Sequence, residues 1–222
     1  MHSNHSTLPI QMFLPSETVE LIAEYGSDFP HNLALEQDMT ILFSDMRDFT
    51  ELAERFEPRE VYASINASIA LQVKSVHAYG GSVNKFLGDG LLACFSGEGK
   101  SERAVACAAE LLRVLPEHEG ALLPCRIGFG INSGKIMFGV LGDAMRWEYT
   151  VVGDVANTAA RLCGIAKPFQ ALVTESVFED MSPASRQKYC SFLRPQMFKG
   201  KKHPVGIYEV RAESDDDADK SA

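Results

Sequence analysis

The order in which apolar runs and amphipathic stretches alternate constrains the fold of this chain most. Runs of strand length, bounded by polar or turn residues, occur at 39–43, 82–86, 91–95 and 127–131. Two helical patterns lie between them, one from Pro58 to the glycines at 80–81 and one from Ser101 to Pro116. The Gly-Asp-Gly sequence at 88–90 predicts a tight hairpin turn between the second and third runs.

The resulting order is strand, helix, strand, strand, helix, strand. This order predicts an α+β fold of the ferredoxin-like split βαβ type, with an antiparallel sheet and helices on one face. Asn132-Ser133-Gly134 predicts a turn after the fourth strand, leading into 136–138. Beyond it we expect a strand at 149–152, a helix at 154–166 and short elements up to Val210.

Composition suggests one domain with two flanks. The chain has 222 residues, which suits a single domain of ordinary size. We expect a lead-in linker at 1–33, containing a short helix at 16–25 that starts like a capped helix. The domain itself is expected at 34–212, followed by an acidic, disordered tail at 213–222. No run of apolar residues is long enough to span a membrane, and no secretory signal is visible.

Charge and cysteine usage exclude some functions. The formal net charge is −9, and the sequence pI is about 5.2, which argues against a general nucleic-acid binder. The five cysteines are scattered, without a CxxC pair. We expect reduced thiols in a cytoplasmic protein, serving as small core residues.

Two aspartates, Asp45 and Asp89, stand out. Asp45 follows the first strand, and Asp89 lies in the hairpin turn. In a split βαβ sheet the first strand lies beside the hairpin, so both carboxylates can converge at one edge. Mg²⁺ prefers oxygen ligands, and two carboxylates can bridge two ions. The alternative is that Asp45 caps the next helix and Asp89 merely suits a turn.

Three segments carry a family resemblance. They are Ile41-Leu42-Phe43-Ser44-Asp45-Met46-Arg47-Asp48-Phe49-Thr50, Asn84-Lys85-Phe86-Leu87-Gly88-Asp89-Gly90, and the stretch from Glu148-Tyr149-Thr150 to Asn157-Thr158-Ala159-Ala160-Arg161. In this order and spacing, over roughly residues 36–211, the chain resembles the catalytic domain of class III nucleotidyl cyclases, which are adenylyl and guanylyl cyclases.

The resemblance implies a metal and phosphate site. Asp45 and Asp89 match the two metal-binding aspartates, and the carbonyl of Met46 matches a further ligand, for two Mg²⁺ or Mn²⁺ ions. Backbone amides near Phe49 and Thr50 would face the β- and γ-phosphates of the substrate.

One position in this segment departs from the family. Many members have glycine where this chain has Asp48. Aspartate tolerates left-handed backbone angles better than most residues, so we expect the loop to form.

The resemblance also implies base-selecting residues. Lys85 matches the lysine of adenylyl cyclases, where guanylyl cyclases have glutamate. A lysine only donates, and adenine N1 accepts, so Lys85 indicates ATP. Thr150 matches the second base-selecting position, and its hydroxyl can accept from the adenine amino group. Threonine here is similar to the bicarbonate-responsive subgroup, which makes bicarbonate a candidate activator.

Asn157 and Arg161 lie four residues apart and therefore share a helix face. They match the asparagine that orients the ribose and the arginine that stabilises the transition state, a task suited to a permanently charged guanidinium. Lys199 matches a lysine that binds the terminal phosphates. Alternatively, it belongs to a solubilising lysine cluster before a strand.

The expected reaction is conversion of ATP to cyclic AMP and pyrophosphate. Because one chain carries both residue sets, the resemblance implies a head-to-tail homodimer with shared active sites. A guanylyl cyclase is the alternative that Lys85 disfavours. A silent regulatory domain would be marked by loss of a metal aspartate, and a diguanylate cyclase would need a GG(D/E)EF motif, which residues 80–84 lack.

Overall fold

A computed structural model describes residues 13–26, 32–117, 123, 125–143 and 145–212. The expected tail at 213–222 and the start of the lead-in lie outside the described residues, so the domain boundaries stay predictions. None of the described helices has the length and apolar character needed to cross a membrane.

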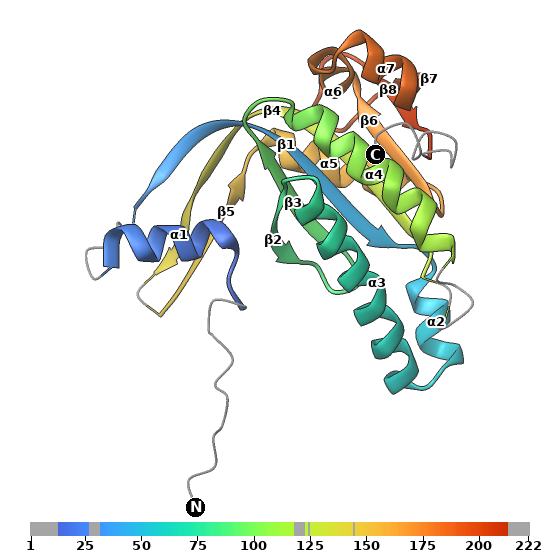
Figure 1. Ribbon diagram of the computed structural model, residues 1–222, viewed down its shortest axis with the longest axis horizontal. Helices are drawn as coiled ribbons and strands as arrows, with labels where there is room; N and C mark the ends of the chain where they lie inside the picture. Colours follow the sequence, from blue (N-terminus) through green and yellow to red (C-terminus); the bar gives the residue numbers. More distant parts are fainter. Residues whose placement is uncertain (1–12, 27–31, 118–122, 124, 144, 213–222) are drawn as a thin grey trace, which may run out of the picture.

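Within the described residues, eight strands form one sheet (Figure 1). Along the sheet the order is β2-β3-β1-β4-β6-β8-β7, and β5 pairs with β4 beside this path. The strands are β1 (Ala34–Met46), β2 (Ser82–Phe86), β3 (Leu91–Ser96), β4 (Ile127–Asp143), β5 (Arg146–Val152), β6 (Gln170–Thr174), β7 (Cys190–Gln196) and β8 (Val205–Val210).

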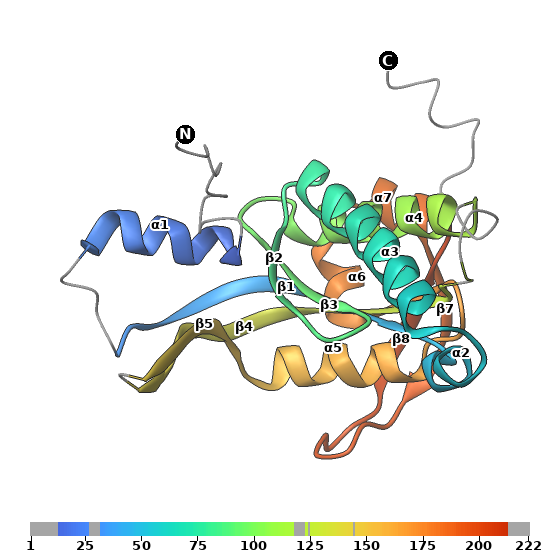
Figure 2. The same cartoon turned by 90° about the horizontal axis from the view of Figure 1, so that it is seen from below.

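The split βαβ unit is confirmed. Strands β2, β3, β1 and β4 are antiparallel neighbours, as the sequence predicts. Helices α3 (Pro58–Ala78) and α4 (Lys100–Glu117) cover one face of the sheet, and α5 (Asp154–Ile165) covers the opposite face (Figure 2). The other helices are α1 (Ser16–Tyr25), α2 (Phe49–Arg55), α6 (Glu175–Asp180) and α7 (Pro183–Tyr189).

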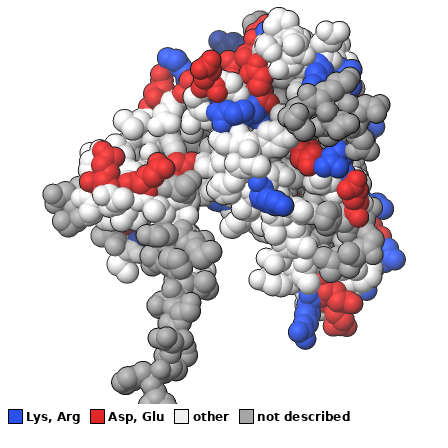
Figure 3. Space-filling view, in the orientation of Figure 1, with Lys and Arg blue, Asp and Glu red and all other residues white. Residues whose placement is uncertain are grey.

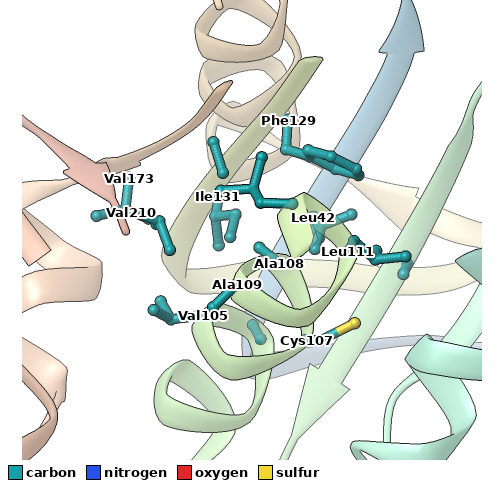
Figure 4. Packing of buried hydrophobic residues seen from close by; sticks show 14 of the residues in the cluster. Leu42, Val105, Cys107, Ala108, Ala109, Leu111, Phe129, Ile131, Val173 and Val210 are labelled. Carbon is teal, nitrogen blue, oxygen red and sulfur yellow. The ribbon is translucent and has the colours of Figure 1, made fainter. Parts of the chain in front are cut away.

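Alternation along the strands explains the two layers of core. Successive side chains of a strand point to opposite faces. Leu42 therefore belongs to the cluster under α3 and α4, together with Phe129 and Leu111 (Figure 4). Its neighbour Ile41 belongs to the cluster under α5, and both are fully buried. Four cysteines, 94, 107, 163 and 190, are buried as expected.

The predicted turn at Asn132-Ser133-Gly134 is wrong. These residues continue β4, with Ser133 opposite Thr40 in the ladder with β1. Asn132 is used for tertiary contacts instead, because its amide Nδ2 donates to Val155 O at 3.0 Å and its Oδ1 accepts from Thr174 Oγ1 at 2.7 Å. The predicted end of α4 is also slightly short, since Pro116 lies inside its last turn.

Helix α1 lies where the sequence predicts a helix, but its N-cap Pro15 makes no side-chain cap hydrogen bond. The helix packs against β2. Leu21 is buried in the cluster that also contains Tyr149, and Ser82 hydrogen-bonds to Glu17. This part of the lead-in is therefore packed on the domain.

Candidate active site

The two aspartates converge, as the topology predicts. Asp45 lies near the end of β1, which pairs with β3 through contacts such as Phe43 with Leu92. The β2–β3 turn therefore comes up against the end of β1. A Cβ atom on Gly90 would lie 2.0 Å from the Ser44 carbonyl oxygen, so this close approach requires glycine. Asp89 is held in the same turn.

The acidic pair carries unbalanced negative charge. Burial, reinforced by the charge of Asp45, raises the pKa of Asp89 despite opposing contributions from its own backbone amide and from Arg47. Arg47 forms an ion pair with Asp45, and its largely buried guanidinium also reaches Gly164 O, at 3.4 Å. Two carboxylates face one guanidinium, an oxygen-rich arrangement that fits a divalent cation. Sequence reasoning missed Arg47 as a member of the site.

Among the described residues no cluster of three or more Asp, Glu, His or Cys side chains could hold a metal. A metal bound by Asp45 and Asp89 would therefore need further ligands that are not Asp, Glu, His or Cys side chains. The backbone carbonyl of Met46, at the last position of β1, is one candidate, and substrate phosphates are others. The residues present fit the expected Mg²⁺ or Mn²⁺ in donor chemistry.

The loop after β1 forms with Asp48 in the left-handed region, at φ 61° and ψ 24°. The expectation that aspartate can replace glycine there is met. Helix α2 begins next, and its first internal bond runs from Leu52 N–H to Asp48 O. The amides of Phe49 and Thr50 consequently lie outside the helix's own hydrogen-bond ladder. Both side chains are exposed.

Lys85 and Thr150 also come together, at a junction between β2 and β5 that we call the β2–β5 seam. Lys85 forms an ion pair with Glu148, and both are partly exposed. Thr150 Oγ1 donates to Asn84 Oδ1 at 3.0 Å, while Asn84 Nδ2 donates to Tyr149 O at 3.1 Å. These two strands are not neighbours in the sheet, so side chains make the junction.

Sequence reasoning missed Asn84 and Glu148. The available signal was their position, because Asn84 precedes Lys85 and Glu148 lies two residues before Thr150 on the same strand face.

Helix α5 presents Asn157 and Arg161 on its exposed side, as their spacing predicts. Arg161 Nη1 donates to the backbone oxygen of Lys199 at 2.6 Å, which brings the third expected residue to the same place. The opposite side of α5 packs on Gly130 of β4. A Cβ there would lie 2.1 Å from Cys163 N, so the helix backbone rests directly on the strand.

The site residues thus fall into two sets. The first, the acidic set, comprises Asp45, Met46, Phe49, Thr50 and Asp89. The second, the base and ribose set, comprises Lys85, Thr150, Asn157, Arg161 and Lys199. Within the described part of the chain, no hydrogen bond or ion pair joins one set to the other. On the face shown in Figure 3, Lys and Arg are scattered among acidic side chains without a continuous basic stripe.

The chain is similar in sequence to curated adenylate cyclases. The chain is 29% identical to an adenylate cyclase of Anabaena cylindrica over 91% of its own length and 42% of that protein. It is 30% identical to an adenylate cyclase of Dictyostelium discoideum over 90% of its length but 10% of that protein. It therefore spans less than half of these relatives.

Solved structures give the same result for the fold. The crystal structure of the adenylyl cyclase CyaB from P. aeruginosa matches with a TM-score of 0.73 and 26% identity, covering 83% of this chain and 98% of that one. The guanylyl cyclase Cya2 matches with a TM-score of 0.71 and 29% identity, covering 82% and 95%. The sequence profile described as the adenylate and guanylate cyclase catalytic domain matches residues 33–210. The chain belongs to this family of class III nucleotidyl cyclase catalytic domains.

Proposed function

We propose that this domain is an adenylyl cyclase, converting ATP to 3′,5′-cyclic AMP and pyrophosphate. The observation that carries the choice of ATP is Lys85 at the β2–β5 seam, beside Thr150. A lysine ammonium donates only, so it complements the N1 acceptor of adenine and opposes the N1–H of guanine. Lys85 forms an ion pair with Glu148, and the base would replace Glu148 as its partner.

The reaction is an internal phosphoryl transfer. The ribose 3′-oxygen forms a bond to the α-phosphorus, the bond to the bridging oxygen of the β-phosphate breaks, and the hydroxyl proton is released. Asn157 holds the ribose for in-line attack, and Arg161 stabilises the charge on the α-phosphate. The amides of Phe49 and Thr50, together with Lys199, hold the terminal phosphates.

Asp45, Asp89 and the Met46 carbonyl would hold two Mg²⁺ or Mn²⁺ ions. Bound there, the ions supply Lewis-acid activation of the hydroxyl and neutralise the triphosphate. The raised pKa of Asp89 supports this role, because burial and Asp45 disfavour its ionised form until a cation is present.

The active site is proposed to be shared in a head-to-tail homodimer. The support is that one chain carries both the acidic set and the base and ribose set, which the family resemblance assigns to opposite subunits of each site. The test mixes two inactive variants, Asp45→Ala and Arg161→Ala. Mixed dimers then contain one intact site, and random exchange should restore about a quarter of wild-type activity.

The matched control mixes Arg161→Ala with Asn157→Ala, which damage the same set and should show no recovery. Dimer exchange is followed by native mass spectrometry. Mixed dimers without recovered activity in the first pair would contradict shared sites.

The substrate assignment is tested by turnover of ATP and GTP with Mg²⁺ or Mn²⁺, with the cyclic product identified by chromatography. A higher kcat/KM for GTP would make the domain a guanylyl cyclase. The absence of any cyclic product would favour a silent regulatory domain. We also propose bicarbonate as an activator, from Thr150, and a flat activity response to bicarbonate at fixed pH would exclude it.

A further inference from the structure

The hydroxyl of Thr150 is not free to rotate. Thr150 as a residue is 2% exposed, and its hydroxyl donates its proton to Asn84 Oδ1 at 3.0 Å. A hydroxyl can donate one hydrogen bond and accept two. The direction in which the hydroxyl donates its own proton therefore determines whether Thr150 can act toward a base as a donor or as an acceptor.

Asn84 fixes that proton. The side chain of Asn84 is also buried, at 4% exposed, and its Nδ2 faces the carbonyl of Tyr149 at 3.1 Å. A backbone carbonyl only accepts, so the amino end of Asn84 must point to Tyr149 and the oxygen end to Thr150. Reversing either bond would leave buried polar atoms unsatisfied, which is strongly unfavourable.

We propose that Asn84 is a specificity-determining positioning residue, which makes Thr150 an obligate hydrogen-bond acceptor and so favours adenine over guanine. The inference rests on the proposed function, in which Thr150 meets the edge of the base. The 6-amino group of adenine donates to the lone pairs of Thr150. The 6-oxo group of guanine is itself an acceptor and meets the same lone pairs with repulsion.

The position of the pair supports this role. Asn84 is adjacent to Lys85, and Tyr149 is adjacent to Thr150, so one hydrogen-bonded unit joins the strands that carry both base-selecting residues. Lys85 and Glu148, which are more exposed, lie at the same β2–β5 seam. A threonine held this way offers the base only acceptor lone pairs, as a carboxylate would.

The test replaces Asn84 by leucine, which has a similar shape and no hydrogen-bonding groups. Freed from Asn84, the hydroxyl of Thr150 can donate to a 6-oxo group. The ratio of kcat/KM for ATP to kcat/KM for GTP should fall about tenfold, the scale of one neutral hydrogen bond. Inosine triphosphate, which has the 6-oxo group without the 2-amino group, should gain in parallel.

Two further variants separate specificity from structure. Asn84→Asp loses the bond to Tyr149 O but keeps an acceptor for the hydroxyl, and it should retain the preference for ATP. In a Thr150→Asp background, where the carboxylate accepts without help, Asn84→Leu should leave the ratio unchanged. Asn84→Ala is measured beside the leucine variant and should show the same fall, so the test does not depend on one protein folding. Unfolding midpoint and dimer mass are recorded for each.

A folded, dimeric Asn84→Leu or Asn84→Ala protein with an unchanged ratio would overturn the inference. An equal loss for both nucleotides would do the same, because it would show a structural tie between β2 and β5 alone. These results are distinct from failure of the proposed function, which would appear in the wild-type protein as a preference for GTP or a lack of cyclic product.

Discussion

Gly130 is a point of close contact between β4 and α5. A Cβ atom added there would lie 2.1 Å from Cys163 N and 2.3 Å from Ala159 O. Ordinary contacts of a Cβ atom begin near 3.4 Å, so Gly130→Ala requires a displacement of about 1.3 Å. Both atoms belong to the helix backbone, so no change of rotamer can relieve the overlap.

The substitution should therefore move the helix that carries Asn157 and Arg161. A misplacement of about 1 Å can reduce the rate of a positioned reaction roughly a hundredfold. Overpacking of this kind also lowers the free energy of unfolding by about 1–3 kcal/mol. We expect Gly130→Ala to fold with a lower thermal midpoint and to lose about a hundredfold in cyclic AMP formation, measured under saturating Mn²⁺ and ATP.

Gly164→Ala is the matched control. Gly164 lies near the end of the same helix, and a Cβ there would meet nothing within 4 Å. Alanine is the better helix former by up to about 1 kcal/mol, so stability should hold or rise, with activity unchanged.

Mixing experiments then locate the damage. Gly130→Ala leaves Asp45 and Asp89 in place, so with Asp45→Ala it should recover activity and with Arg161→Ala it should not. The reasoning is refuted if Gly130→Ala retains wild-type activity and thermal midpoint, or if it complements Arg161→Ala instead.

Other changes probe the remaining charges. Hydrogen bonds from Lys100 and Ser101 outweigh the effect of burial and lower the pKa of Asp180, so its stabilisation is complete above the ordinary value of 3.8 and is lost as pH falls below it. Asp180→Asn should cost about 1 kcal/mol at neutral pH, allowing for the partly exposed carboxylate, and thermal melts should show this difference shrinking below about pH 4. Mn²⁺ without nucleotide should raise the unfolding midpoint of the wild type. Asp89→Asn should abolish turnover and remove this rise; a persisting rise would place the metal elsewhere. Lys85→Glu should destroy the ATP preference, and adding Glu148→Lys should restore the ion pair and the melting midpoint but not the preference, as nucleotide competition would reveal.

The parts of the fold that local pattern controls could be predicted. The alternation of apolar runs placed the split βαβ unit, and this topology alone brought Asp45 and Asp89 together. The predicted turn from Asn132 to Gly134 was wrong because these residue types favour turns locally. Their tertiary partners decide otherwise, since Asn132 is bound by Thr174 and Val155, which lie on other elements.

Asn84 and Glu148 were missed for a different reason. Asn84 and Thr150 are 66 residues apart, and Lys85 and Glu148 are 63 apart. Periodicity within a window reports which face a side chain occupies, not which distant side chain it meets. The family resemblance supplied Lys85 and Thr150 individually, but the hydrogen bonds that Thr150 and Tyr149 make with Asn84 are visible only in the three-dimensional structure.

The unbroken course of β4 has a consequence for any rearrangement of this domain. Its first half packs against α5 at Gly130. Its second half pairs with β5, where Gly139 lies opposite Thr150. One inserted residue between these points would advance the strand by about 3.3 Å and reverse which face each later side chain occupies. Chimeric cyclases that gain or lose a residue between Gly130 and Gly139 should therefore misalign the proposed base and ribose sites even when every individual residue is kept.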